Sequence, residues 1–358
     1  MGPGTLLPEL ENPTTRKDIK IIDSQLKDET NEITILPSPF PDLMRTDYPD
    51  FRADLAENGF TILKGVIPRE RAAGYQEKAY EWIRSFPGDL DMAKPDTWVD
   101  KNLPMTNSIN AYAYYCVTHE KFFWDARQEQ GVIDAFAKIW GTDQLLVSFD
   151  AMNITFPNRK DVPRRLPWEH IDQSPIRRGA HCIQGLIVLS PSGPEDGGLV
   201  VFPGSHKLND EFFDSQTDRE SWLPMQDIHL FKKEELEWFV ARGVHPHKVC
   251  AEVGDLILWD SRTIHYGSEP TEKSNQIRTV LYVTYMPANL ATPEQLALKC
   301  EAFEKYSSTT HWPHQYIVPR PNVVYLPDGN LDRRNREQPL ESPELTDKLL
   351  KLAGIKPY

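Results

Sequence analysis

The stretch that decides the fold runs GDLILWDSRTIHYG, from Gly254 to Gly267. Its apolar run Leu256–Trp259 is typical of a short buried β-strand. Similar short runs, separated by clusters of glycine and proline, occur at Leu145–Phe149, Met152–Phe156, Ile183–Leu189, Leu199–Phe202 and Thr279–Tyr285. Several short strands divided by turn residues favour an antiparallel barrel or a double-sheet jelly roll. We therefore expect a mainly β fold with flanking helices.

Helical patterns lie on both sides of these strands. Apolar spacing and cap residues predict helices from Phe51 to Asn58, from Pro68 past Ile83, over Gly131–Trp140, over Pro293–Tyr306, and from Ser342 as N-cap to Gly354. A further strand is expected at Phe60–Leu63. We divide the chain into an arm at 1–48, a main domain at 49–290 with a helical insertion near 208–245, and C-terminal helices and tail at 291–358 that pack on the core.

Composition and charge exclude several classes of function. The chain has 358 residues, of which 39% are hydrophobic and 26% charged, with a net charge of −13. These fractions are typical of a globular protein with a sizeable core. A negative surface repels phosphate backbones and anionic lipids, so we expect a small-molecule substrate and neither nucleic acid nor membrane as partner. We expect a monomer or a homodimer.

The cysteines and the termini indicate a soluble intracellular protein, which we place in the cytoplasm. Its four cysteines lie far apart and form no CxxC pair, so we expect reduced thiols. The N-terminus lacks the charged start and apolar run of a signal peptide. No stretch approaches the roughly 18–20 apolar residues that span a bilayer.

The strongest chemical motif is WEHIDQ, at Trp168–Gln173. In a strand, side chains two positions apart point to the same face, so His170 and Asp172 could both reach one metal ion. A His-x-Asp pair alone is a weak signal, because average residue frequencies give about one such pair by chance in a chain of this length.

Two further stretches strengthen the motif. GGLVVFPGSHK occupies residues 197–207, while GDLILWDSRTIHYG contains His265 and is followed thirteen positions later by Arg278. With these motifs in this order, residues 50–290 resemble the phytanoyl-CoA dioxygenase-like branch of the iron(II)/2-oxoglutarate oxygenases, and most of all its fungal members. The resemblance implies a double-stranded β-helix core, the cupin-like jelly roll.

The resemblance also implies the roles of individual residues. It assigns His170, Asp172 and His265 as ligands of Fe(II), a set that leaves three positions open on the metal. It implies that 2-oxoglutarate and O₂ fill these positions. Arg278 would hold the distal carboxylate of 2-oxoglutarate through the planar fork of its guanidinium. Asn153 and Thr155, on one face of the preceding strand, would contact the cosubstrate, unless they make ordinary core hydrogen bonds.

Other residues have two readings each. Arg177 and Arg178 could meet an acidic group of the substrate or form surface salt bridges. Trp168 could wall the pocket or pack in the core, and we expect His206 to be structural. Many relatives have serine two positions after the distal histidine; here Gly267 stands there and Ser268 follows, which weakens any transfer of that contact. We expect the 208–245 insertion and the 90–125 region to form the outer wall of the pocket.

Three alternatives accompany the resemblance. A rival metal site could use His181-Cys182, His245 with His247, or His311 with His314, but none has a second half at zinc-like spacing. The chain could be a non-catalytic metabolite-binding protein on the same fold, or a cupin-type metalloenzyme that does not use 2-oxoglutarate. Within the leading interpretation, a carboxylate at Asp172 disfavours halogenation and leaves hydroxylation, desaturation and oxidative ring closure. The substrate would be a specialised metabolite or a free amino acid.

Overall fold

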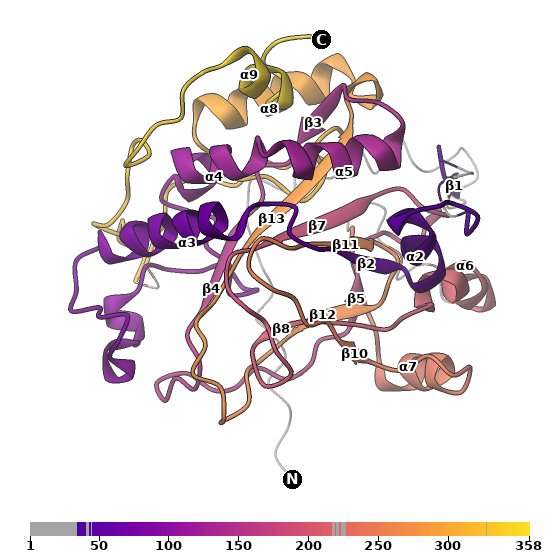
Figure 1. The fold of residues 1–358 in the computed structure, drawn as a ribbon, viewed down its shortest axis with the longest axis horizontal. Coiled ribbons are helices and arrows are strands. Elements are labelled where there is room, and N and C mark those ends of the chain that lie inside the picture. The colour runs from indigo at the N-terminus through magenta and orange to yellow at the C-terminus, as the bar shows by residue number, and fades with distance from the viewer. Residues whose placement is uncertain are drawn as a thin grey trace.

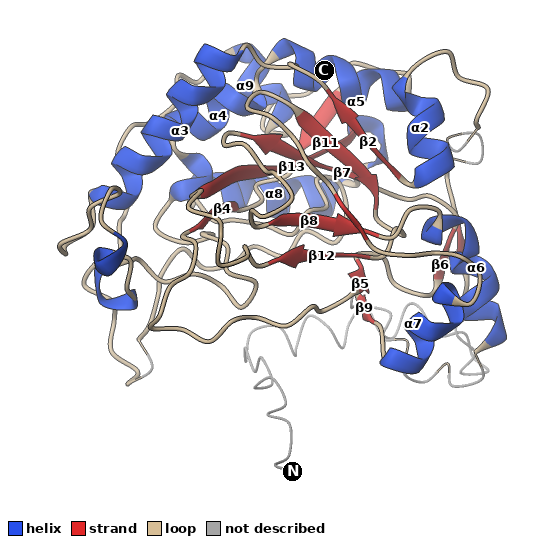
Figure 2. Ribbon diagram, turned by 60° about the horizontal axis from the view of Figure 1, so that its bottom comes forward, coloured by secondary structure: helices blue, strands red, loops and turns tan. Residues whose placement is uncertain are grey.

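Two antiparallel sheets flanked by helices form the centre of the structure (Figures 1 and 2). The structure is a computed structural model that describes residues 34–40, 43, 45–216, 219, 222, 227–326 and 328–358. The larger sheet has the order β2-β11-β7-β13-β3, and β4 also pairs with β13. Its strands are β2 (Phe60–Leu63), β3 (Leu145–Val147), β4 (Met152–Thr155), β7 (Ile183–Val188), β11 (Leu256–Asp260) and β13 (Arg278–Pro287).

The smaller sheet has the order β10-β8-β12-β5-β9. Its strands are β5 (His170–Ile171), β8 (Gly198–Val201), β9 (His229–Leu230), β10 (His247–Lys248) and β12 (His265–Ser268). Two further short strands, β1 (Leu36–Pro37) and β6 (Arg177–Arg178), pair in parallel. Every strand predicted from the sequence is present within about two residues. The strands that the sequence did not predict have only two to four residues, which is too few to show a period.

Side chains alternate across the larger sheet and so divide its two faces. On β7, Ile183 and Ile187 belong to the cluster shared with the helices, whereas Leu186 and Val188 belong to a second cluster between the sheets. Strand β13 repeats the pattern, with Leu281 on the helical side. This alternation is the expected consequence of the two-residue period of a strand, and it turns the even-numbered residues of β7 and β13 towards the smaller sheet.

Helices cover the outer face of the larger sheet (Figure 1). They are α3 (Arg69–Arg84), α4 (Lys121–Arg127), α5 (Gln130–Trp140), α8 (Pro293–Glu304) and α9 (Asp347–Leu352), with α2 (Phe51–Asn58) beside β2. Short 3₁₀ turns are η1 (Pro95–Thr97), η2 (Asp100–Asn102), η3 (Val117–His119) and η4 (Ala288–Leu290). In the described chain, helical residues outnumber strand residues, so the expected "mainly β" composition was wrong. The reason is that the outer face of the larger sheet must be buried, and helices cover it.

The predicted start of the last helix was also wrong. Helix α9 begins at Asp347, and Thr346 rather than Ser342 is its N-cap, because the Thr346 hydroxyl accepts a hydrogen bond from the Leu349 amide at 3.1 Å. Gly354 follows the helix with φ +76°, as predicted for a residue after a helix end. The α4 helix was not predicted at all.

The insertion contains two helices, α6 (Ser205–Ser215) and α7 (Lys233–Val240), with strand β9 between them. These helices pack behind the smaller sheet in a cluster that contains Ile171 and Ile264, the neighbours of two predicted metal ligands. Most of the predicted arm lies outside the described residues, although Leu36–Pro37 pairs with Arg177–Arg178. None of the helices in the described ranges has both the length and the apolar character needed to cross a bilayer.

Candidate metal centre

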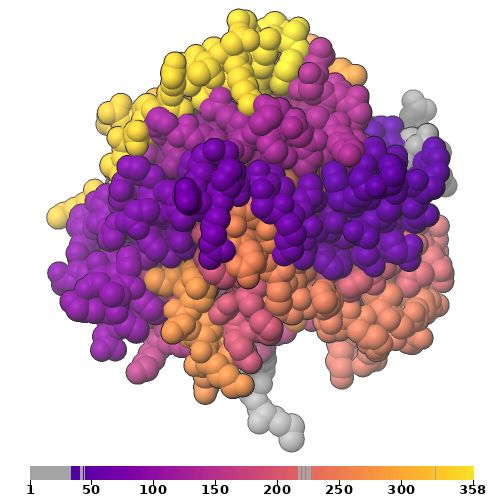
Figure 3. All heavy atoms as spheres, in the orientation of Figure 1, coloured from indigo at the N-terminus to yellow at the C-terminus, as the bar shows by residue number. Residues whose placement is uncertain are grey.

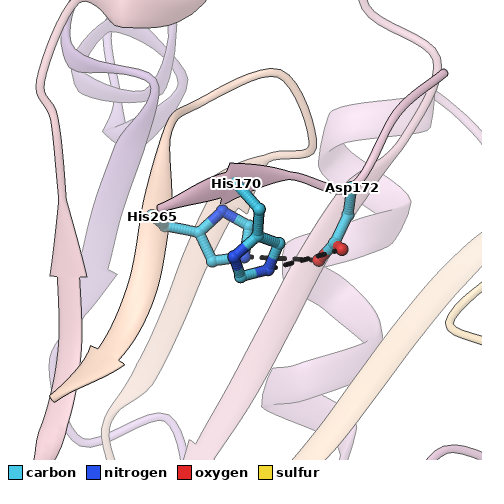
Figure 4. Close-up of side chains that lie close together, drawn as sticks. All are labelled: His170, Asp172 and His265. Atoms are coloured by element: carbon cyan, nitrogen blue, oxygen red, sulfur yellow. Dashed lines mark ion pairs between the residues drawn. The ribbon is translucent and has the colours of Figure 1, made fainter. Parts of the chain in front are cut away.

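The three predicted metal ligands come together on the inner face of the smaller sheet (Figure 4). His265 on β12 pairs in register with His170 on β5, and the centres of their rings are 4.2 Å apart. Directly opposed residues of an antiparallel pair share a face, so strand register alone brings these imidazoles together. Asp172 follows β5, and its amide donates to the Ser261 carbonyl at 2.9 Å, which fixes the backbone where the strand has ended.

The ligand atoms are close enough to share one ion. The Nε2 atom of His170 lies 3.5 Å from Oδ1 of Asp172, and Nε2 of His265 lies 3.3 Å from Oδ2. The three ligand atoms lie within 4.8 Å of one another, and no other such group of three occurs in the described part of the chain. Two imidazoles and one carboxylate are the donor set of non-haem iron(II) oxygenases.

Hydrogen bonds prepare both imidazoles for a metal. Nδ1 of His170 lies 3.0 Å from the Trp168 carbonyl, and Nδ1 of His265 lies 2.9 Å from the Thr263 carbonyl. A carbonyl can only accept, so each Nδ1 carries the proton and each Nε2 presents a lone pair to the ion.

The pKa values favour the forms that bind metal. Burial, followed by the nearby His265, lowers the pKa of His170 to about 4, so this imidazole is neutral at pH 7. Burial by itself raises the pKa of Asp172, but attraction to His170 and His265 outweighs it and holds this pKa below its usual value. Asp172 therefore stays ionised, and its side chain is 20% exposed while both imidazoles are almost fully buried.

An amide that the sequence did not single out holds the carboxylate. Nε2 of Gln184, on the inner face of β7, donates to Oδ2 of Asp172 at 3.0 Å and lies 3.2 Å from the Ser261 hydroxyl. Because Asp172 lies beyond the end of β5, this contact and the Ser261 carbonyl replace the missing strand pairing. Gln184 is thus a positioning residue for the third ligand.

We expect Gln184→Leu to weaken iron binding by about 10–100-fold, the usual cost of losing an outer-shell partner of a metal ligand. The measurement is anaerobic titration with Fe(II), with Gln76→Leu as the matched control, since Gln76 bonds to Tyr80 and Thr279 and not to a predicted ligand. Equal iron affinity in Gln184→Leu and wild type would show that Gln184 does not position Asp172.

Strand register places five side chains in one row across the smaller sheet. The pairs join His247 to Val201, Val201 to His265, His265 to His170, and His170 to Leu230. Leu230 comes from the insertion, shares the face of His170, and is 51% exposed. The insertion therefore both backs the ligand strands and places one exposed apolar side chain beside the candidate metal centre.

The predicted cosubstrate residues form a connected group at the start of β13. Nη1 of Arg278 donates to Oδ1 of Asn153 at 2.6 Å, the Thr155 hydroxyl donates to the same oxygen at 2.9 Å, and Nδ2 of Asn153 donates to the Asn110 carbonyl. Asn153 and Thr155 thus make core hydrogen bonds that orient Arg278; their direct contact with a cosubstrate stays a prediction. Asn110 belongs to the 90–125 region, which therefore lies beside this group.

Arg278 has the surroundings of an anion-binding residue. It is 7% exposed, and no carboxylate of the described residues forms an ion pair with it. Buried charges are almost always paired, because an isolated charge loses its hydration without compensation. A carboxylate ligand would supply the missing negative charge.

The two arginines after the His-x-Asp motif are occupied by the protein. Arg177 pairs with Asp227 at 3.3 Å and lies 5.1 Å from the Trp312 ring centre. Arg178 pairs with Asp214 at 3.1 Å. The salt-bridge reading is confirmed, although both arginines are half-buried rather than on the open surface.

The remaining candidates also find their places. The Trp168 ring stacks on the His170 ring, with ring centres 4.0 Å apart and an interplanar angle of 9°, so it covers one face of a predicted metal ligand. His206 lies 3.0 Å from the Ala56 carbonyl in the first turn of α6, the structural role expected of it. The Ser268 hydroxyl accepts from Lys248 and donates to the Gly198 carbonyl, and strand alternation puts it on the face opposite His265.

The rival metal sites are contradicted within the described residues. His181, His245, His247, His311 and His314 belong to no group of three possible ligands. The imidazole of His181 instead contacts the Leu36 carbonyl at 3.3 Å.

Sequence reasoning missed Gln184, Trp259 and Tyr282, and it considered His311 only as part of a rival metal site. Trp259 lies 5.5 Å from His265, and Tyr282 lies on the inner face of β13, where Arg278 acts on its pKa. Both occur in apolar runs that only indicated strands. His311 lies far beyond the motifs, in a proline-rich segment, so spacing offered no signal.

Comparison with known proteins agrees with this geometry. The pattern of the phytanoyl-CoA dioxygenase (PhyH) family matches residues 55–280. The Aspergillus versicolor "Ava biosynthesis cluster protein O" is 39% identical over 275 residues, covering 76% of this chain and 88% of that protein.

Two solved bacterial structures share the fold. The putative oxidoreductase from Salmonella typhimurium LT2 is 15% identical, with a TM-score of 0.57, covering 96% of this chain and 92% of the other. The hypothetical protein JW0805 from Escherichia coli is 16% identical, with a TM-score of 0.55, covering 95% and 90%. The family match and the buried His170–Asp172–His265 group support Fe(II) and 2-oxoglutarate as metal and cosubstrate. The chain belongs to the phytanoyl-CoA dioxygenase (PhyH) family.

Proposed function

We propose that this protein is an Fe(II)- and 2-oxoglutarate-dependent oxygenase that removes hydrogen from a small molecule, on a double-stranded β-helix made by the two sheets. The observation that carries the proposal is the pairing of a buried two-histidine, one-carboxylate group with a buried arginine that has no acidic partner among the described residues. A cupin-type metalloenzyme that does not use 2-oxoglutarate would have no need for such an arginine.

Each residue has a defined task in this proposal. Bound iron, with 2-oxoglutarate and O₂, supplies the oxidising power for attack on an unactivated carbon. His170 and His265 present Nε2, and Asp172, steadied by Gln184, presents a carboxylate oxygen. Arg278, held by Asn153, binds the distal carboxylate of 2-oxoglutarate. The Trp168 ring covers His170 and keeps water from one side of the site.

The ligand set narrows the reaction. A carboxylate at Asp172 completes the protein's share of the coordination, which disfavours binding of a halide in its place. Hydroxylation, desaturation and oxidative ring closure each begin with removal of hydrogen, and the proposal covers these three. The relative named after a biosynthesis cluster favours a specialised metabolite over a free amino acid as substrate, acted on by a monomer or homodimer.

The test is oxygen-dependent formation of succinate. Protein loaded anaerobically with Fe(II) and 2-oxoglutarate is mixed with air and with fractions of a fungal metabolite extract, and succinate and new oxidised products are measured by mass spectrometry. We expect both to rise together, and neither to form without iron. A non-catalytic binding protein would consume no 2-oxoglutarate with any ligand that it demonstrably binds, and turnover that ignores 2-oxoglutarate would identify a different metalloenzyme.

A further inference from the structure

The inner faces of β7 and β13 extend from Arg278 at one end to Trp312 at the other. Along β13 the even residues lead from Arg278 to Met286, and Thr284 pairs in register with Gln184 of β7. One step further on this face, Cys182 and Met286 pack with Trp312 in a buried cluster. The segment that contains Trp312 therefore lies just beyond the contact between Gln184 and Asp172, at the end of the sheets opposite the arginine.

The protein holds this segment in one conformation. Thr309 makes two hydrogen bonds with Phe149. The Thr309 amide donates to the Phe149 carbonyl at 3.0 Å, and the Thr309 hydroxyl accepts from the Phe149 amide at 3.2 Å. The Thr310 hydroxyl accepts from the Trp312 amide and donates to the Tyr316 carbonyl, which closes residues 310–316 into a turn. Arg177 lies over Trp312. The turn is thus anchored beside Asp150 on one side and beside Arg177 on the other.

The turn carries polar atoms that the protein leaves without partners. Within the described ranges, fourteen buried side-chain atoms lack a hydrogen bond, and three belong to His311, Trp312 and His314. Nε2 of His311 is one of them, although the ring itself is partly exposed. His311 is close enough to both His170 and Asp172 to act on their pKa values. A buried nitrogen without a partner is costly, so Nε2 of His311 is available to a group from outside the chain.

Two further features describe that group. The charges beside the turn occur in opposite pairs: Arg177, over Trp312, pairs with Asp227 at 3.3 Å, and Arg320 lies within electrostatic reach of Asp150. Such offsetting charges favour a neutral ligand. Paired in register with His170, the exposed Leu230 offers an apolar contact. A neutral amide or hydroxyl satisfies either tautomer of an imidazole, because both groups donate and accept.

We propose that the turn at residues 311–314 is the substrate-recognition edge of the metal centre, where Nε2 of His311 binds a neutral amide or hydroxyl of an otherwise apolar small molecule whose apolar part contacts Leu230. The inference rests on the proposed function, and it assigns a role to a segment beyond the residues that match the family pattern.

The test compares a polar probe with its apolar isostere. Phenylacetamide and isobutylbenzene have nearly the same shape, but only the first has an amide. Binding of each to protein loaded with Fe(II) and 2-oxoglutarate, without oxygen, is measured by ligand-observed NMR. We expect wild type to prefer phenylacetamide, and His311→Ala to weaken its binding about tenfold, the usual loss for one hydrogen bond, with isobutylbenzene unchanged. His311→Gln, which keeps a polar group, should recover part of the preference.

Controls separate this inference from the proposed function. His247→Ala, an exposed histidine at the far end of the ligand row, should bind both probes as wild type does. The proposed function has its own readout in wild type: a wild-type protein that binds no Fe(II) under anaerobic conditions would refute the proposed function instead. The inference is overturned if wild type does not bind phenylacetamide, if it does not distinguish the probes, or if His311→Ala binds phenylacetamide as tightly as wild type does.

Discussion

His170→Ala is expected to abolish stable iron binding and, with it, all formation of succinate from 2-oxoglutarate. The substitution removes one of only three ligand atoms, which lie within 4.8 Å of one another. Loss of an outer-shell partner already costs about 10–100-fold in metal affinity, so loss of a ligand should exceed about 100-fold. The variant also removes the surface on which Trp168 stacks, but the register of the smaller sheet does not depend on the imidazole.

The measurement is the iron content after anaerobic loading and desalting, followed by succinate formation in air. His247→Ala is the matched control, because it makes the same change on the same row of the sheet, two strands from His265, without removing a ligand. We expect the control to keep full iron content and turnover. A His170→Ala protein that loses its iron but still turns over would refute the proposed mechanism.

The candidate site could be predicted where strand geometry and motif order act together. His170 and Asp172 are separated by the period of a strand, although β5 ends before Asp172, and His265 was supplied by the order of motifs that the chain shares with the family it resembles. The register that sets His265 opposite His170 could not be predicted, because β5 has only two residues and so short a strand has no sequence pattern that identifies its pairing partner.

The parts that the sequence did not reveal depend on contacts between distant segments. Gln184 lies in a run that reads only as a buried strand, and its link to Asp172 arises from the packing of one sheet on the other. Thr346 caps the last helix although Ser342 and Pro343 fit the same pattern, because tertiary packing decides between competing caps. The segment of His311 is held by hydrogen bonds between Thr309 and Phe149, which lie 160 residues apart, and no local spacing encodes such a contact.

These contacts place the proposed cosubstrate-binding and substrate-recognition residues at opposite ends of one face of β13. Arg278 at its start has no acidic partner in the described chain, whereas Met286 near its end packs under Trp312. The metal ligands lie between, beside Gln184. Cosubstrate and substrate would thus approach the metal from opposite ends of this face.

Arg278→Ala should raise the 2-oxoglutarate concentration needed for half-maximal turnover by roughly 30-fold or more, since truncating one partner of a buried charge pair costs about 2–5 kcal/mol. Iron affinity measured without 2-oxoglutarate should stay within about twofold of wild type, because Arg278 contacts Asn153 and not a ligand. Arg278→Lys should recover only part of the loss: it restores the charge, but an ammonium cannot make the two parallel bonds of a guanidinium. Asn153→Ala, which removes the orienting contact and keeps the charge, should have a smaller effect than Arg278→Ala. If instead all three variants need no more 2-oxoglutarate than wild type, the anchor lies elsewhere, and the buried guanidinium must serve a different anion.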